Sequence, residues 1–99
     1  MANRTRPRAF RPDQAEALAA EVLGRLAADE WRLGRFLDTT GLRPEDVRQA
    51  AREPGFPVAV LDHVLGDETL LLALAEELGQ PPEAFAAARH ALAPEFDGG

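Results

Sequence analysis

Prolines and glycines divide this chain into short segments, and none of them alternates apolar with polar residues over the length of a strand. The residues between these breaks are mostly Ala, Leu, Glu and Arg, which favour helix, and β-branched residues are scarce. The sequence therefore predicts an all-α fold. Apolar spacing and end signals place six helices, at about residues 12–28, 30–40, 44–53, 57–65, 68–78 and 82–93. Connections this short make consecutive helices neighbours, which indicates a compact six-helix bundle.

Four residues mark helix ends most clearly. Asp29 and Asp67 each precede a helix and are typical N-caps, because a carboxylate accepts hydrogen bonds from the free N–H groups of the first turn. Gly41 and Gly79 follow the same two helices and favour the left-handed conformation that ends a helix. The second of these helices, residues 68–78, has leucines on almost every side, so we expect it to be the central buried helix.

The two halves of the chain resemble each other. A shift of 38 residues aligns Asp29 with Asp67, Gly41 with Gly79 and seven further identical pairs across residues 22–52. One interpretation is a pair of three-helix units, residues 19–53 and 57–91, each containing a helix-turn-helix-like pair. The other is that helix caps admit few residue types, so that unrelated capped helices look alike. The sequence leaves both interpretations open.

Charge separates the first residues of the chain from its body. The net charge is −6, yet the first twelve residues carry no acid and four arginines: Arg4, Arg6, Arg8 and Arg11. We expect residues 1–12 to form a flexible basic arm, residues 13–93 a single helical domain and residues 94–99 a flexible acidic tail. The body is acidic and repels polyanions, so any nucleic acid would bind through the arm.

The absent residue types exclude several kinds of catalytic site. The chain has no Cys, Ser, Lys or Tyr, so it has no thiolate or serine nucleophile, no Schiff-base lysine and no P-loop lysine. Asp67 follows His63 by four residues, but Gly66 should end the helix between them, and His90 has no partner at metal-ligand spacing. We therefore expect His63 to lie at the surface beside a helix cap. We therefore predict no catalytic residue, no metal and no cofactor, and we expect the chain not to be an enzyme.

Two sequence features argue against membrane and DNA binding. The longest apolar run, residues 70–75, is too short to cross a membrane, so we expect a cytoplasmic protein without a membrane partner. Residues 74–85 form a helix, a glycine turn and a second helix, which resembles a helix-turn-helix motif. The front of that second helix is acidic and would be repelled by DNA, which favours helix packing over DNA reading.

The single tryptophan lies beside two arginines. Trp31 is in the first turn of the helix predicted over residues 30–40, and Arg32 and Arg35 lie near the same side of that helix. In so small a domain, packing of Trp31 in the core or at a helix junction is the favoured interpretation. If Trp31 is exposed, these three residues form a patch suited to an acidic protein partner.

Six short runs carry a resemblance to a known family: Leu33-Gly34-Arg35-Phe36-Leu37, Thr40-Gly41-Leu42, Asp46-Val47-Arg48, Glu53-Pro54-Gly55-Phe56, Val60-Leu61-Asp62 and Asp67-Glu68. They resemble a bacterial family of short helical proteins, the domain of unknown function 3572. The resemblance covers about residues 13–93 and leaves out the basic arm and the acidic tail. It implies a small all-helical bacterial protein and supplies no catalytic or binding residues.

Two functional hypotheses follow from these observations. The first is a noncatalytic protein–protein interaction module, which binds another protein or a second copy of itself where the two three-helix units meet. Its candidate contact residues are Trp31, Arg32 and Arg35. The alternative is a small nucleic-acid-associated regulator that uses the arginines of the basic arm, with binding that weakens steeply as salt is added.

Overall fold

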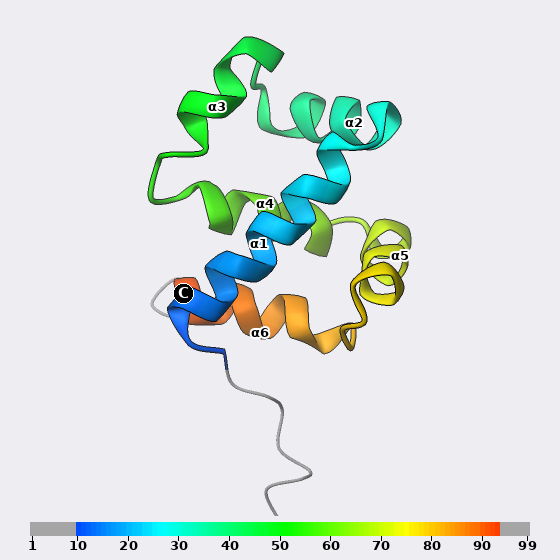
Figure 1. Cartoon of the computed structure of the whole chain (residues 1–99). Coiled ribbons are helices and arrows are strands. Elements are labelled where there is room, and N and C mark those ends of the chain that lie inside the picture. The colour runs from blue at the N-terminus through cyan, green and yellow to red at the C-terminus, as the bar shows by residue number, and fades with distance from the viewer. Residues whose placement is uncertain (1–9, 94–99) are drawn as a thin grey trace, which may run out of the picture.

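Helices make up the regular secondary structure of residues 10–93, the part of the chain that the computed structural model describes (Figure 1). The all-α prediction and the order of six helices are confirmed within this range. The elements are α1 (Pro12–Ala27), α2 (Glu30–Thr40), the 3-10 turn η2 (Pro44–Asp46), α3 (Val47–Ala50), α4 (Phe56–Leu65), α5 (Glu68–Leu78) and α6 (Glu83–Leu92).

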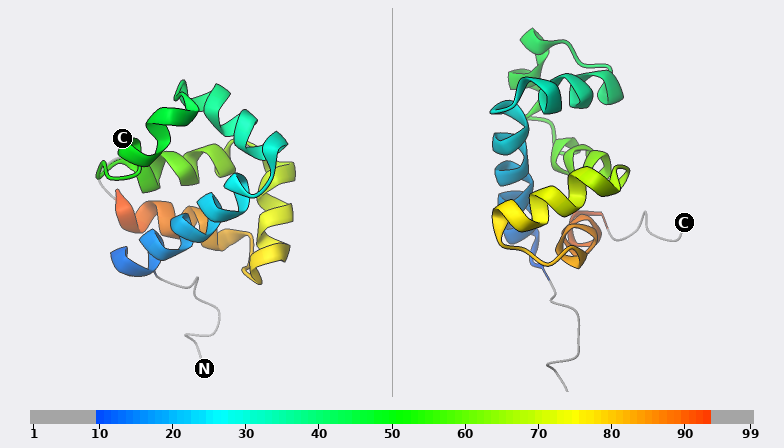
Figure 2. Two further views of the ribbon diagram at one scale, coloured as in Figure 1. Left: turned by 45° about the horizontal axis from the view of Figure 1, so that its top comes forward. Right: turned by 90° about the vertical axis from the view of Figure 1, so that its right-hand side faces the viewer.

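The centre of the fold is α1, which packs against both α4 and α6 (Figure 2). Its buried side chains recur every three or four residues, as a helix with one apolar face requires, and they include Leu18, Val22 and Leu26. Leu61 on α4 and Phe85 on α6 are fully buried in the same core. Helices α2 and α5 flank this core, and each contacts α1 and α4. The two flanking helices are therefore held by the same pair of core helices.

The expectation that residues 68–78 form the central buried helix is wrong. This segment is α5, and only Leu74 and Ala75 on it are buried. Leu72 is 49% exposed. The reason is that α5 lies at the edge of the bundle and packs through one side, so its extra leucines reach the surface. A helix with leucines on every side does not by itself show which side faces the core.

The helix predicted over residues 44–53 is much shorter in the structure. Pro44–Asp46 form a 3-10 turn, α3 covers only Val47–Ala50, and turns continue to the start of α4. Neither element has a buried residue, although Ala50 is partly buried against the core. So little packing does not support extension of a single turn into a longer helix. In the predicted repeat this segment corresponds to α6, which is a full helix with three buried residues. The duplication therefore stays a prediction.

The two aspartate caps form as predicted. The Oδ1 atom of Asp29 accepts hydrogen bonds from the backbone N–H groups of Trp31, at 2.9 Å, and Arg32, at 3.1 Å. The Oδ1 atom of Asp67 accepts one from the backbone N–H of Leu70 at 3.1 Å. These bonds satisfy N–H groups that have no partner within the helix. They fix where α2 and α5 begin.

The two glycine caps also form, with left-handed backbones at Gly41 (φ 76°) and Gly79 (φ 66°). An L-residue with a side chain is strained in this conformation by roughly 1–2 kcal/mol. We predict that Gly41→Ala lowers the free energy of unfolding by about 1 kcal/mol, which is about 4–8 °C in Tm for a domain of this size. Thermal unfolding followed by circular dichroism measures the change.

Gly34→Ala is the matched control, because Gly34 lies inside the same helix and a methyl group there meets nothing within 4 Å. Alanine favours helix over glycine, so this variant gains about 0.8–1 kcal/mol. Equal shifts in Tm for the two variants would contradict the left-handed cap.

Candidate functional site

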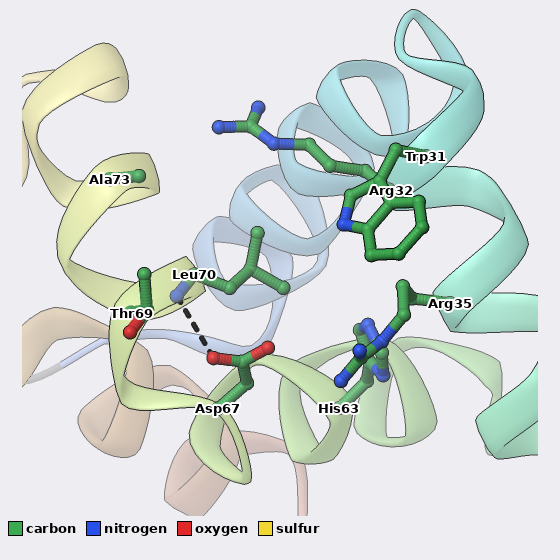
Figure 3. Close-up of a pocket in the computed structure, with 8 residues that line it drawn as sticks. All are labelled: Trp31, Arg32, Arg35, His63, Asp67, Thr69, Leu70 and Ala73. Atoms are coloured by element: carbon green, nitrogen blue, oxygen red, sulfur yellow. Dashed lines mark hydrogen bonds between the residues drawn. The ribbon is translucent and has the colours of Figure 1, made fainter.

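A pocket of about 210 Å³ lies where α2, the end of α4 and the start of α5 meet (Figure 3). We refer to it as the α2–α5 pocket. The three residues of the predicted patch line it together with five residues from the second half of the chain. The lining residues are Trp31, Arg32, Arg35, His63, Asp67, Thr69, Leu70 and Ala73.

The favoured interpretation of Trp31 as a core or helix-junction residue is wrong. Trp31 is 74% exposed and stands at the rim of the pocket (Figure 3). The reason is the orientation of α2, which buries Phe36 completely. Five residues separate the two positions, which places them roughly 140° apart around a helix. Burial of Phe36 therefore turns Trp31 toward solvent.

Arg32 joins the two helices that flank the pocket. Its Nη1 and Nη2 atoms donate to Oε1 and Oε2 of Glu77 on α5, at 3.0 and 2.6 Å. This hydrogen-bonded pair raises the pKa of Arg32 and lowers the pKa of Glu77. Arg25 lies 3.8 Å from the same carboxylate. Arg32 therefore links α2 to α5, and the carboxylate of Glu77 neutralises its charge.

The expectation that His63 lies at the surface is also wrong. His63 is only 9% exposed, and its ring packs edge to face against Phe36 with 5.3 Å between ring centres. Its Nε2 atom is buried and has no hydrogen-bond partner among the described residues. The sequence contains a signal for this burial, because His63 lies between Val60 and Val64 on the apolar helix α4, where both valines are buried.

Burial keeps the ring of His63 neutral. Loss of solvent lowers the pKa of His63, the carboxylate of Asp67 acts in the opposite direction, and the guanidinium of Arg35 lowers the pKa further. A neutral imidazole has one N–H donor and one nitrogen acceptor. The pocket therefore holds a buried, uncharged polar group whose hydrogen bonding is incomplete.

Arg35 and Asp67 carry the remaining charges of the pocket. The guanidinium of Arg35 lies 6.0 Å from the centre of the Trp31 ring, a cation–π distance. Within residues 10–93 no carboxylate lies at ion-pair distance from Arg35. Asp67 is engaged with the start of α5, and the positive end of that helix offsets its charge. Arg35 is thus the charge of the pocket that lacks compensation in this part of the chain.

Comparison with known proteins assigns the chain to a family. A family model described as a protein of unknown function (DUF3572) matches residues 12–95. The chain belongs to the DUF3572 family. The resemblance inferred from the short sequence runs is therefore confirmed. No curated protein and no solved structure matches the chain.

This member of the DUF3572 family has a second cavity, of about 350 Å³, between α1 and residues 51–57. Its apolar walls include Leu23, Phe56 and Val60, and its charged residues, at positions 16, 52 and 53, are all exposed. Sequence reasoning missed it, because part of its wall is the turn segment that replaces the predicted helix. Although larger than the α2–α5 pocket, it contains no buried polar group to orient a ligand.

The other predicted sites lie mostly outside the described part of the chain. Arg4, Arg6 and Arg8 fall in residues 1–9, and Arg11 is the one arginine of the predicted arm that lies within the described residues. Arg11 is exposed, with its Nε atom 3.6 Å from Asp13. Between residues 10 and 93, no three potential ligand side chains converge on a metal-sized site, and no helix has the length and apolar character to cross a membrane. Polyanion binding by the arm stays a prediction.

The burial of His63 can be tested by measuring the free energy of unfolding. We predict that His63→Phe raises the free energy of unfolding at pH 7 by about 1 kcal/mol, because the variant removes an unsatisfied buried polar group and keeps the ring contact with Phe36. The pH dependence also changes. Because folding lowers the pKa of His63, the unfolded chain binds its proton more readily, and stability is lost as the pH falls below about 6.5. Loss of this acid sensitivity is the expected result for His63→Phe.

Denaturant unfolding between pH 5 and pH 8 measures both effects, and the difference between wild type and variant isolates His63 from the carboxylates. His90→Gln is the control, because His90 lies on the exposed side of α6. A wild-type profile that His63→Phe does not alter would contradict the buried neutral histidine.

Proposed function

We propose that this chain is a noncatalytic protein-interaction module and that its partner binds in the α2–α5 pocket. The observation that carries the proposal is the exposed tryptophan at the rim of that pocket. Phe36, Phe56 and Phe85 are at most 8% exposed, whereas Trp31 is 74% exposed. Tryptophan and arginine are the residue types most enriched where partners bind most strongly, and both are present here.

The size of the pocket supports a protein partner. Pockets for cofactors and drug-sized molecules usually enclose about 300–1,000 Å³. At about 210 Å³ the α2–α5 pocket is smaller, and it suits one or two side chains inserted from a larger partner. The ring of Trp31 then adds apolar contact area at the rim.

The pocket is also formed before a partner arrives. Asp29 and Asp67 fix the starts of the two flanking helices, and the hydrogen-bonded pair of Arg32 and Glu77 ties those helices together. A surface held in its binding geometry loses less conformational entropy on association. This arrangement favours binding even though the pocket is small.

The polar groups of the pocket favour binding over catalysis. His63 has no carboxylate hydrogen-bonded to its ring in the described part of the chain, and Thr69 has no general base bonded to its hydroxyl. A nucleophile needs a base within hydrogen-bond reach, and a general base needs a positioned partner. The groups present here supply hydrogen bonds and charge, which are means of recognition.

Peptides selected from a random phage-displayed library test the proposal. We predict that a selected peptide binds the double variant Trp31→Ala/Arg35→Glu about tenfold or more weakly than wild type, because the variant removes both candidate anchors. The matched control is Leu72→Ala/Arg48→Glu, which makes the same kinds of change at exposed positions away from the pocket. Titration calorimetry measures both affinities.

The oligomeric state provides a second measurement. If the partner is a second copy of the chain, sedimentation shows a dimer for wild type and the control variant, and a monomer for Trp31→Ala/Arg35→Glu. A selected peptide that binds both double variants as tightly as wild type would contradict the proposal. Failure to select any peptide, together with a monomeric wild type, would also contradict it.

A further inference from the structure

We infer that the α2–α5 pocket binds a carboxylate group, held between the guanidinium of Arg35 and the ring of His63. This inference rests on the proposed function and specifies the chemistry of the partner. Its first support is the Nε2 atom of His63, which is buried without a hydrogen-bond partner in the described structure. A buried polar group without a partner is costly, and a ligand that supplies the missing hydrogen bond removes that cost.

The neighbour of His63 determines which kind of ligand fits. Arg35 extends from α2 toward His63 (Figure 3), and its charge is close enough to disfavour protonation of the ring. A guanidinium has only donors, and in this inference the hydrogen of the neutral imidazole lies on Nε2, which makes that atom a donor as well. The group that satisfies both must be an acceptor. A negative charge on it compensates Arg35 and makes these hydrogen bonds stronger.

The charges around the pocket favour a single negative charge. Arg32 is already balanced by Glu77, and Asp67 contributes a negative charge at the start of α5. One guanidinium therefore remains for the ligand. A carboxylate carries one negative charge, and its two oxygens can accept a pair of hydrogen bonds from one guanidinium. A phosphate monoester carries nearly two negative charges and would be repelled by the carboxylate of Asp67. The pocket therefore favours a carboxylate over a phosphate monoester.

The remaining walls indicate what lies beside the carboxylate. Leu70 and Ala73 form an apolar side of the pocket on α5, and the exposed ring of Trp31 faces them from α2 (Figure 3). An aromatic or aliphatic group next to the carboxylate would bury apolar area against these residues. Arg35 is exposed, and exposed side chains change rotamer within nanoseconds, so it can move to admit the ligand.

Small probes that differ in one functional group test the inference. The first pair is acetyl-phenylalanine, which has a free carboxylate, and acetyl-phenylalaninamide, which does not. The second pair is acetyl-glutamyl-phenylalaninamide and its glutamine counterpart, which place the carboxylate on a side chain. Amide chemical shifts of the labelled full chain locate the binding site and show that the chain stays folded. We expect each carboxylate to bind the pocket about tenfold more tightly than its neutral counterpart.

Which carboxylate binds more tightly distinguishes the two sources. Tighter binding of acetyl-phenylalanine assigns the pocket to the carboxyl end of a partner chain. Tighter binding of the glutamyl probe assigns it to an acidic side chain. Either result supports the inference, because both contacts use the same chemistry.

Variants separate recognition from folding. We expect Arg35→Gln and His63→Phe each to weaken carboxylate binding about tenfold, while His63→Gln retains binding because its amide N–H₂ can replace the Nε2–H donor. Arg48→Gln is the matched control for loss of an exposed arginine outside the pocket. His63→Phe keeps the ring packed against Phe36, so its amide spectrum should remain that of the folded chain.

Three results would overturn the inference. They are equal binding of the carboxylate and neutral probes, tighter binding of phenethylamine than of acetyl-phenylalanine, and no binding of either carboxylate at millimolar concentration. Each leaves the proposed function to be decided separately by the selected peptides. A selected peptide without any carboxylate that still depends on Trp31 would keep the interaction module and overturn the carboxylate site.

Discussion

Burial of Phe36 determines how the candidate site is built. Its ring is completely buried, and it lies edge to face with Phe56, 6.0 Å between ring centres, and with His63, at 5.3 Å. These contacts hold α2 in one orientation against α4. In that orientation Trp31 and Arg35 face outward at the mouth of the pocket, and His63 forms part of its wall. Loss of this packing would change both the core and the binding surface.

The pocket combines rigid surroundings with incomplete hydrogen bonding. Capped helix starts and the bond between Arg32 and Glu77 fix the two flanking helices, whereas the buried Nε2 atom of His63 has no hydrogen-bond partner within residues 10–93. Such a group reduces stability, and most proteins bury few of them. Groups that lower the stability of the free protein are concentrated at functional sites, because binding requires hydrogen-bonding or charged groups that have no partner until the ligand binds. His63 and Arg35 fit that description.

Local signals in the sequence predicted both ends of α2 and of α5 correctly. Aspartate and glycine act within their own turn of helix, so Asp29, Gly41 and their counterparts at 67 and 79 needed no knowledge of the rest of the fold. The outward orientation of Trp31 could also have been predicted, because a helix that buries Phe36 must turn Trp31 away from the core.

The misassigned features depend on contacts between distant segments. The leucines of α5 do not reveal that the helix lies at the edge of the bundle. The valines around His63 indicate that it is buried, but they do not reveal that Phe36 of α2 packs against its ring. The segment at 44–53 has good helix signals, yet none of its residues is fully buried, so little core packing supports a longer helix. The pocket itself joins α2 with residues about thirty to forty positions later in the chain. Only the packing of these helices brings its two halves together.

Fluorescence of the single tryptophan tests the central claim most directly. If α2 buries Phe36 and exposes Trp31, the emission of the folded chain is that of a solvated indole, and acrylamide quenches it nearly as well as in the denatured chain. Unfolding then changes the emission wavelength little. A blue-shifted emission, which acrylamide quenches only after the chain unfolds, would show that Trp31 is buried. That result would contradict the orientation of α2 on which the pocket and its proposed function depend.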